Sequence, residues 1–120
     1  MKRIALASLV VAVVAAVAML TTAQAATPVL KGEVGPGFTI EVKKAGKKVK
    51  TLKAGKYTIK VEDKASIHNF HLIGRGVNKL TSVEFVGKKT WTVTLKPGKY
   101  TFQCDPHAAN GMMGSFKVTK

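Results

Sequence analysis

The segment that most restricts what this chain can become is residues 100–116, YTFQCDPHAANGMMGSF, which contains the only cysteine. Cys104, His107 and Met112 follow one another with the spacing Cys-x2-His-x4-Met. Pro106 and an Asn-Gly dipeptide favour turns between these side chains. A thiolate, an imidazole and a thioether can therefore converge on one point, which indicates a site for a soft metal ion.

This set of ligands favours copper over zinc. Trigonal His2Cys sites with a long axial Met are typical of blue-copper centres, whereas structural zinc sites take four ligands from Cys and His. The segment supplies one histidine, so a second must come from elsewhere, and only His68 and His71 remain. For an isolated cysteine we would favour a small buried hydrophobe, but the spacing to His107 and Met112 favours metal ligation.

These residues give the chain its resemblance to small cupredoxins of the plastocyanin, pseudoazurin and amicyanin type. His68-Asn69 is similar to the first-ligand pair of that family, and GMMG at 111–114 resembles the end of the plastocyanin loop. The resemblance implies one mononuclear type 1 copper site with the ligands His68, Cys104, His107 and Met112. It also implies that Asn69 ties its strand to the Cys loop by hydrogen bonding, and that the ring edge of His107 is the port for electrons.

Two ligand positions have alternatives. His71 lies three residues after His68, so the two side chains of one strand would point to opposite faces. His68 is preferred because Asn69 follows it. His71 is then expected to point outward or into a second layer of residues, and a solvated strand histidine is the favoured interpretation. For the thioether, Met113 is the alternative to Met112, and we expect Met113 to pack into the sandwich.

The N-terminal residues are typical of a secretory signal peptide. Lys2-Arg3 precede an apolar run at 4–20, and Ala23-Gln24-Ala25 is a small-residue cleavage pattern. The alternative is an uncleaved membrane anchor, since the run approaches the roughly 17 residues that a spanning helix needs. We predict a signal peptide at 1–25 and one domain at 26–120, exported to the periplasm, the cell envelope or the medium, with no stable membrane insertion after cleavage.

The mature chain is strongly basic. Two of the twenty Lys and Arg residues and none of the six acids lie within 1–25, so cleavage lowers the formal charge from +14 to +12. This charge favours an acidic redox partner, with an attraction that salt weakens. Nucleic acid is disfavoured, because the lysines are spread singly along predicted strands and their turns.

The fold class predicted from the residue pattern is all-β. Alternating or β-branched segments occur at 29–34, 38–42, 57–61, 67–73, 90–95, 100–104 and 115–119, and Gly, Pro and Lys separate them. This spacing predicts a Greek-key sandwich of about seven to eight strands. Residues 80–85 fit either a strand or a connecting segment. A repeated Gly-Lys-Tyr-Thr turn, at 55–58 and 98–101, places Cys104 at the end of a strand.

Three functional classes follow from these observations. The first is a monomeric one-electron carrier in which copper alternates between Cu(I) and Cu(II). The second is a module that stores or delivers copper. An enzyme ranks third, because the four predicted ligands complete one mononuclear site and no nucleophile-base pair is evident.

Overall fold

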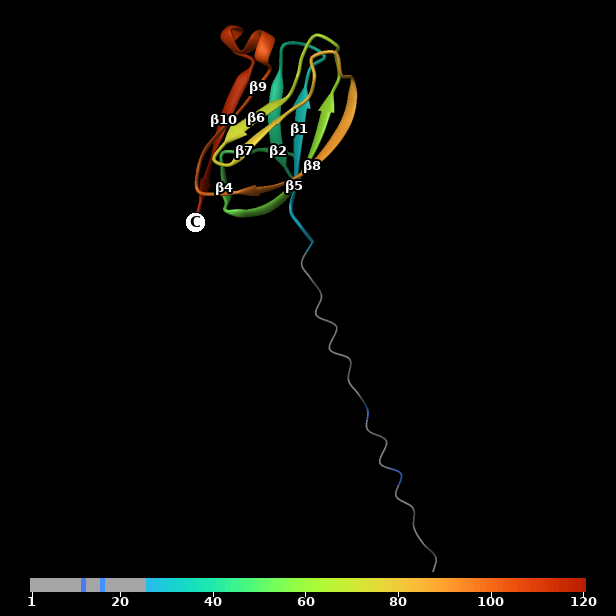
Figure 1. Cartoon of the computed structure of the whole chain (residues 1–120), viewed down its shortest axis with the longest axis vertical. Coiled ribbons are helices and arrows are strands. Elements are labelled where there is room, and N and C mark those ends of the chain that lie inside the picture. Colours follow the sequence, from blue (N-terminus) through green and yellow to red (C-terminus); the bar gives the residue numbers. More distant parts are fainter. Residues whose placement is uncertain (1–11, 13–15, 17–25) are drawn as a thin grey trace, which may run out of the picture.

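Two five-stranded sheets pack face to face in a computed structural model that describes residues 12, 16 and 26–120 (Figure 1). The first sheet has the order β3-β2-β1-β5-β8. Its strands are β1 (Val29–Val34), β2 (Ile40–Lys44), β3 (Lys47–Lys48), β5 (Gly55–Asp63) and β8 (Gly87–Leu95). The all-β sandwich predicted from the sequence is confirmed.

The second sheet has the order β4-β10-β9-β6-β7. Its strands are β4 (Thr51–Lys53), β6 (His71–Gly74), β7 (Val77–Leu80), β9 (Gly98–Gln103) and β10 (Met113–Thr119), and the 3-10 helix η1 (Asp105–Asn110) joins the last two. The described residues form ten strands rather than seven or eight, because β3 and β4 are too short to show an alternating pattern. Two pairs are parallel, β1 with β5 and β4 with β10.

The core lies between the sheets and follows the alternation of the strands. In β5 the side chains of Tyr57, Ile59 and Val61 are buried, and their neighbours in the strand are more exposed. In β9 the inward positions are Tyr100 and Phe102, and Cys104 continues the same phase just beyond the strand. All buried hydrophobic residues of the described part lie between Leu30 and Val118, so the sandwich has a complete core of its own.

The repeated turn motif anchors a tyrosine in each sheet. The Tyr57 hydroxyl donates to the Lys53 carbonyl oxygen at 2.7 Å. The Tyr100 hydroxyl oxygen accepts from the Lys96 N–H at 2.9 Å and lies 3.1 Å from the Arg75 carbonyl oxygen. The Tyr100 bonds fix the start of β9, which ends at Gln103, one residue before the cysteine.

Three predicted segments differ in the structure. The strand expected at 67–73 begins only at His71, because residues 66–67 form a turn, so His68 lies outside the strand. The strand expected at 38–42 begins at Ile40, because residues 36–38 form a bend. Of residues 80–85, only Leu80 belongs to a strand, so this segment is mainly a connection. The predicted signal peptide lies, apart from residues 12 and 16, outside the described residues.

Within the described residues, no helix has the length and apolar character needed to span a bilayer.

Replacing Gly74 with alanine is expected to destabilise the sandwich by about 1–3 kcal/mol. A Cβ atom at Gly74 would overlap Cδ1 of Tyr100. The Tyr100 ring is fully buried and its hydroxyl oxygen accepts from the Lys96 N–H, so it cannot move aside easily. Urea unfolding measures the effect. Gly37→Ala is the matched control, since a Cβ there meets no atom within 4 Å; equal stability of the two variants would contradict the packing argument.

Candidate metal centre

The predicted ligand loop lies at one end of the sandwich, where η1 joins β9 to β10 (Figure 1). The Cys104 N–H donates to the Met112 carbonyl oxygen at 3.0 Å, and the Met112 N–H donates to the His107 carbonyl oxygen at 3.2 Å. Gly111 adopts a left-handed conformation (φ 93°), which lets the chain reverse after η1. The β9–β10 ladder therefore continues one step past the strands and sets Cys104 opposite Met112.

His68 reaches the same point from the turn that precedes β6. Its side chain is fully buried, and its backbone N–H donates to the Ala65 carbonyl oxygen at 3.4 Å. A Cβ atom added at Gly35 would lie 3.1 Å from Cδ2 of His68, so the glycine bend leaves room for the ring.

Three ligand atoms form a compact triangle. Nδ1 of His68 lies 3.1 Å from Nδ1 of His107, and the Cys104 sulfur lies 3.7 and 3.4 Å from these two nitrogens. The circle through atoms with these separations has a radius of about 2.0 Å, close to the 2.0–2.3 Å of metal–nitrogen and metal–sulfur bonds. The triangle therefore matches the trigonal plane of a His2Cys centre.

The chemistry of these residues fits copper. The triangle contains no carboxylate, and one thiolate with two imidazoles suits Cu(I) and Cu(II). Nε2 of His68 is buried and has no hydrogen-bond partner among the described residues. The ring is thus held by packing, with Nδ1 directed at the other two ligand atoms.

Met112 and Met113 differ in burial. Met112 is 2% exposed and continues the inward phase of Phe116 and Val118 in β10, on the side of the ligands. Its role as axial ligand stays a prediction. Met113 is 51% exposed, so the expectation that it packs into the sandwich is wrong. In β10 it belongs to the alternate positions whose side chains point outward, opposite to Phe116 and Val118.

A polar network joins the His68 segment to the Cys104 loop. The Asn69 amide donates to the Asp105 carboxylate at 2.9 Å, and the Asp105 N–H donates to the Asn69 side-chain oxygen at 2.7 Å. These two reciprocal bonds connect the residues that directly follow His68 and Cys104, so the separation of the two ligands is fixed through their neighbours.

His71 belongs to this network and not to the ligand triangle. Its Nδ1 lies 2.8 Å from an Asp105 carboxylate oxygen, and its Nε2 lies 2.6 Å from the Asn78 side-chain oxygen. The favoured interpretation, a solvated histidine, is wrong, because Asp105 from the adjoining loop reaches the ring and the side chain is only 17% exposed. The ring lies in a second layer beside the ligands, which was the alternative. Burial acts to raise the pKa of Asp105, but the hydrogen bonds that its carboxylate accepts outweigh this effect and lower the pKa.

Asp63, at the end of β5, is the other acid near the ligands. It is 1% exposed; one oxygen accepts from the Ala65 N–H at 3.1 Å, and the other has no partner among the described residues. Burial raises the pKa of its carboxyl, against smaller opposing effects of Ala65 and His68.

We expect Asp63→Asn to stabilise the copper-free protein at pH 7 by about 1 kcal/mol, because it removes a buried charge and keeps the oxygen that accepts from Ala65. Since the folded-state pKa is raised, the contribution of Asp63 to stability is fully present below the unfolded pKa of about 3.9 and is lost as pH rises through the folded pKa. The two proteins should therefore be equally stable near pH 4 or below.

Urea unfolding across this pH range measures the difference. Glu84→Gln removes an exposed acid and is the control, expected to change stability little at any pH. A neutral-pH loss of stability in Asp63→Asn would contradict the assignment of a destabilising charge.

Comparison with known families decides the class of the protein. The sequence profile described as copper binding proteins, plastocyanin/azurin family, matches residues 37–119. The chain belongs to this family. The triangle of His68, Cys104 and His107 is accordingly the copper-binding group of a blue copper cupredoxin, with one mononuclear type 1 site.

Solved cupredoxin structures share the fold. Rusticyanin aligns with a TM-score of 0.61 at 21% identity, over 80% of this chain and 80% of that chain. Reduced auracyanin from the photosynthetic bacterium Roseiflexus castenholzii aligns with a TM-score of 0.56 at 21% identity, over 80% of this chain and 100% of that chain.

Sequence reasoning did not identify three residues around the cupredoxin site. Asp105 adjoins the cysteine, but its link to His71 depends on the pairing of β6 with β9. Asp63 reads as an ordinary strand-end acid. Phe38, 65% exposed, lies edge-on to His68 and His107 with ring centroids 5.4 and 5.0 Å away, although it is thirty residues or more distant in sequence. Only a tertiary contact reveals it.

Proposed function

We propose that this blue copper protein is an exported, monomeric one-electron carrier. The observation that supports this function most is the prearranged ligand triangle. The separations between its three ligand atoms fit the coordination of one metal ion. Copper, when bound there, supplies the one-electron couple between Cu(I) and Cu(II). A scaffold that holds its ligands in one geometry limits the rearrangement that accompanies each change of oxidation state.

The described residues fix the positions of two of the three ligands. Cys104 is fixed by the ladder to Met112, and His68 is fixed by burial and by the Asn69–Asp105 bonds. Water has no access to either side chain, since both are 0% exposed.

His107 offers the route for electrons. It is partly exposed, whereas Cys104 and His68 are buried. The exposed side chains of Phe38 and Met113 line a neighbouring groove of about 410 Å³. We propose that this apolar surface, extended by the loop residues 106–109, docks briefly against a redox protein.

We further propose that the partner is acidic and that no enzymatic reaction takes place at the site. The charge of +12 on the mature chain would raise the rate of encounter with an acidic surface. Lys64 and Lys88 are exposed and lie next to the β5–β8 ladder end on the copper side, where Asp63 pairs with Gly87. Among the described residues, the triangle is the only cluster of His, Cys and acidic ligands, which favours a carrier.

The test is reversible redox cycling followed by electron transfer to acceptors of opposite charge. We expect repeated voltammetric cycles without loss of the blue site, and a rate with an acidic acceptor that falls as salt is added. Replacing both Lys64 and Lys88 with glutamine should lower that rate at low salt. The same change at Lys47 and Lys53, on the opposite end of the sandwich, is the control and should lower it less.

Two results would contradict the proposal in different ways. Tight binding of Cu(I) without reversible oxidation would favour copper storage or delivery. Equal rates with acidic and basic acceptors, independent of salt, would exclude an acidic partner and leave the carrier function intact.

A further inference from the structure

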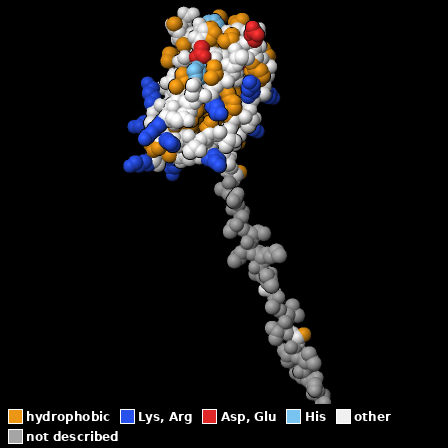
Figure 2. All heavy atoms as spheres, in the orientation of Figure 1, with side chains coloured by type: hydrophobic (Ala, Val, Ile, Leu, Met, Phe, Trp, Pro, Cys, Tyr) orange, Lys and Arg blue, Asp and Glu red, His pale blue; other side chains and the backbone are white. Residues whose placement is uncertain are grey.

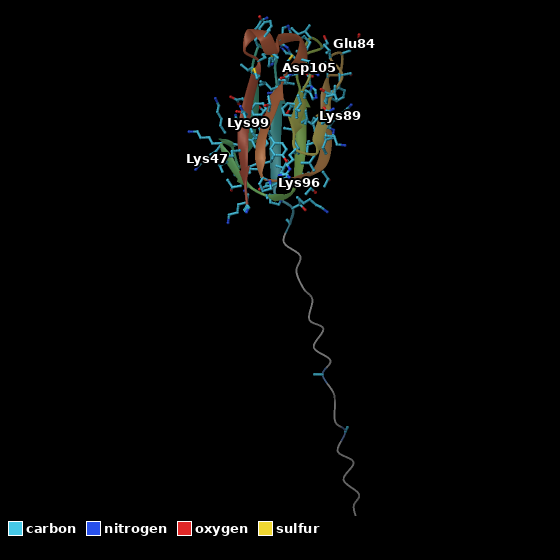
Figure 3. The ribbon with its side chains drawn as sticks, turned by 60° about the vertical axis from the view of Figure 1, so that its left-hand side comes forward. Lys47, Glu84, Lys89, Lys96, Lys99 and Asp105 are labelled. Carbon is cyan, nitrogen blue, oxygen red and sulfur yellow. The ribbon has the colours of Figure 1, made fainter. Side chains whose placement is uncertain are left out.

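Charge is distributed unevenly between the two ends of the sandwich. Figure 3 places Asp105 and Glu84 at the copper end, and Lys47 and Lys96 toward the other end. The strand register places the other four acids. Glu33 and Glu62 are paired, and each is one residue from the copper-side end of its strand, β1 or β5. Asp63 is the last residue of β5, and Glu41 is paired with Glu33. All six acids of the chain therefore lie in the half that contains the copper ligands.

The opposite end has a cluster of lysines, here called the basic pole, that line one groove of about 660 Å³: Lys44, Lys47, Lys48, Lys50, Lys53 and Lys56. No acidic residue lines this groove, and all six lysines are exposed. Within the described residues, Lys48 alone among them forms an ion pair, at 3.4 Å from Glu41. The other five charges are uncompensated, and Figure 2 shows blue side chains gathered toward this end.

The chain enters the sandwich at the basic pole. Pro28, which precedes β1, lines the same groove, and Figure 1 shows residues 26–28 leaving the domain at this end, away from η1. In sequence, the apolar run at 4–20 lies just before this entry point. A membrane from which the mature chain has just been released would thus face the basic pole.

We propose that the basic pole is a docking surface for an anionic lipid bilayer, which holds the protein at the membrane with the copper end turned outward. Five uncompensated lysines can approach a planar layer of phosphate groups together, and juxtamembrane lysines contribute about fivefold each to membrane partitioning. The acids and the His107 surface lie at the other end, so contact with the bilayer leaves the electron port free.

An acidic protein is a less suitable occupant of this surface. A redox partner seated in the groove would be separated from His107 by the length of the sandwich, where it cannot exchange electrons. A lipid surface requires no such proximity, because its role is to concentrate and orient the carrier.

The experiment measures sedimentation of the copper-loaded protein beginning at Ala26 with vesicles of phosphatidylcholine, alone or with 30% phosphatidylglycerol. Binding is expected only with the anionic lipid and should be lost in high salt. Glutamine at Lys44, Lys47, Lys53 and Lys56, which line this groove and not the groove at Phe38 and Met113, should lower partitioning by about 600-fold. The matched control places glutamine at Lys60, Lys64, Lys79 and Lys88, which removes the same charge from other surfaces and should change partitioning far less.

Orientation has a separate readout. The rate at which ascorbate donates an electron to Cu(II) should be the same for free and vesicle-bound protein, because the copper end faces the solution. A several-fold slower reduction on vesicles would show that the copper end docks, and would overturn the proposal. Equal losses in the two quadruple variants, no binding to anionic vesicles, or binding to heparin without binding to vesicles would overturn it as well.

Discussion

Replacing Cys104 with serine is expected to abolish the blue colour of the copper-loaded protein completely. The colour of a type 1 site arises from charge transfer between a thiolate and Cu(II), and Cys104 is the only cysteine of the chain. Its sulfur lies within 3.7 Å of both ligand nitrogens and is fully buried, so no solvent thiol can take its place. Visible absorption of the Cu(II)-loaded variant measures the effect.

Met113→Leu is the matched control, since it alters an exposed side chain at the start of β10, next to Met112, and should keep the colour. Circular dichroism should show that Cys104→Ser keeps the sandwich, because serine is close in size to cysteine. A serine variant that remains blue would show that the thiolate is not a ligand.

The second large effect concerns the two histidines of SIHNFHL. His68→Ala should eliminate the blue site, because it removes one corner of the ligand triangle. His71→Ala should keep most of the absorption, because both ring nitrogens of His71 are engaged by Asp105 and Asn78 and neither belongs to the triangle. Copper titration followed by visible absorption compares the two.

The pair of variants provides its own control, since each removes one imidazole from neighbouring positions. Loss of the Asp105 contact in His71→Ala should shift the absorption slightly through the cysteine loop and lower stability by about 1 kcal/mol. A colourless His71→Ala and a blue His68→Ala would move the ligand to His71.

Local pattern was sufficient to predict most of the sandwich. The strand at Val29–Val34 has the predicted bounds, and those expected at 57–61, 90–95 and 115–119 lie within β5, β8 and β10. These strands bury alternate side chains, so a period of two is visible in the sequence. The short strands β3, β4 and β7 have no such signal, because two to four residues do not define a period.

The convergence of His68, Cys104 and His107 was predictable because two ligands share one loop and few histidines are available. The residues that surround this triangle were not predictable from the sequence. Asp105 was unremarkable in sequence, and its bonds to Asn69 and His71 arise from the pairing of strands more than thirty residues apart. His68 lies before its strand because residues 66–67 form a turn. The sequence did not indicate this turn, because the apolar alternation across 67–73 is typical of a continuous strand.

The parallel pairing of β10 with β4 determines the order in which the protein can assemble. Lys117 of the last strand lies beside Thr51, so the second sheet has no complete edge until the C-terminal residues are present. The copper loop lies between β9 and β10, and His68 is 36 residues before Cys104. Contacts between residues this far apart in the sequence slow folding, because the intervening loop must close first. During synthesis from the N-terminus, the metal site is therefore among the last parts of the chain to be completed. A chain that lacks the residues from Cys104 onward has neither a complete second sheet nor a copper site.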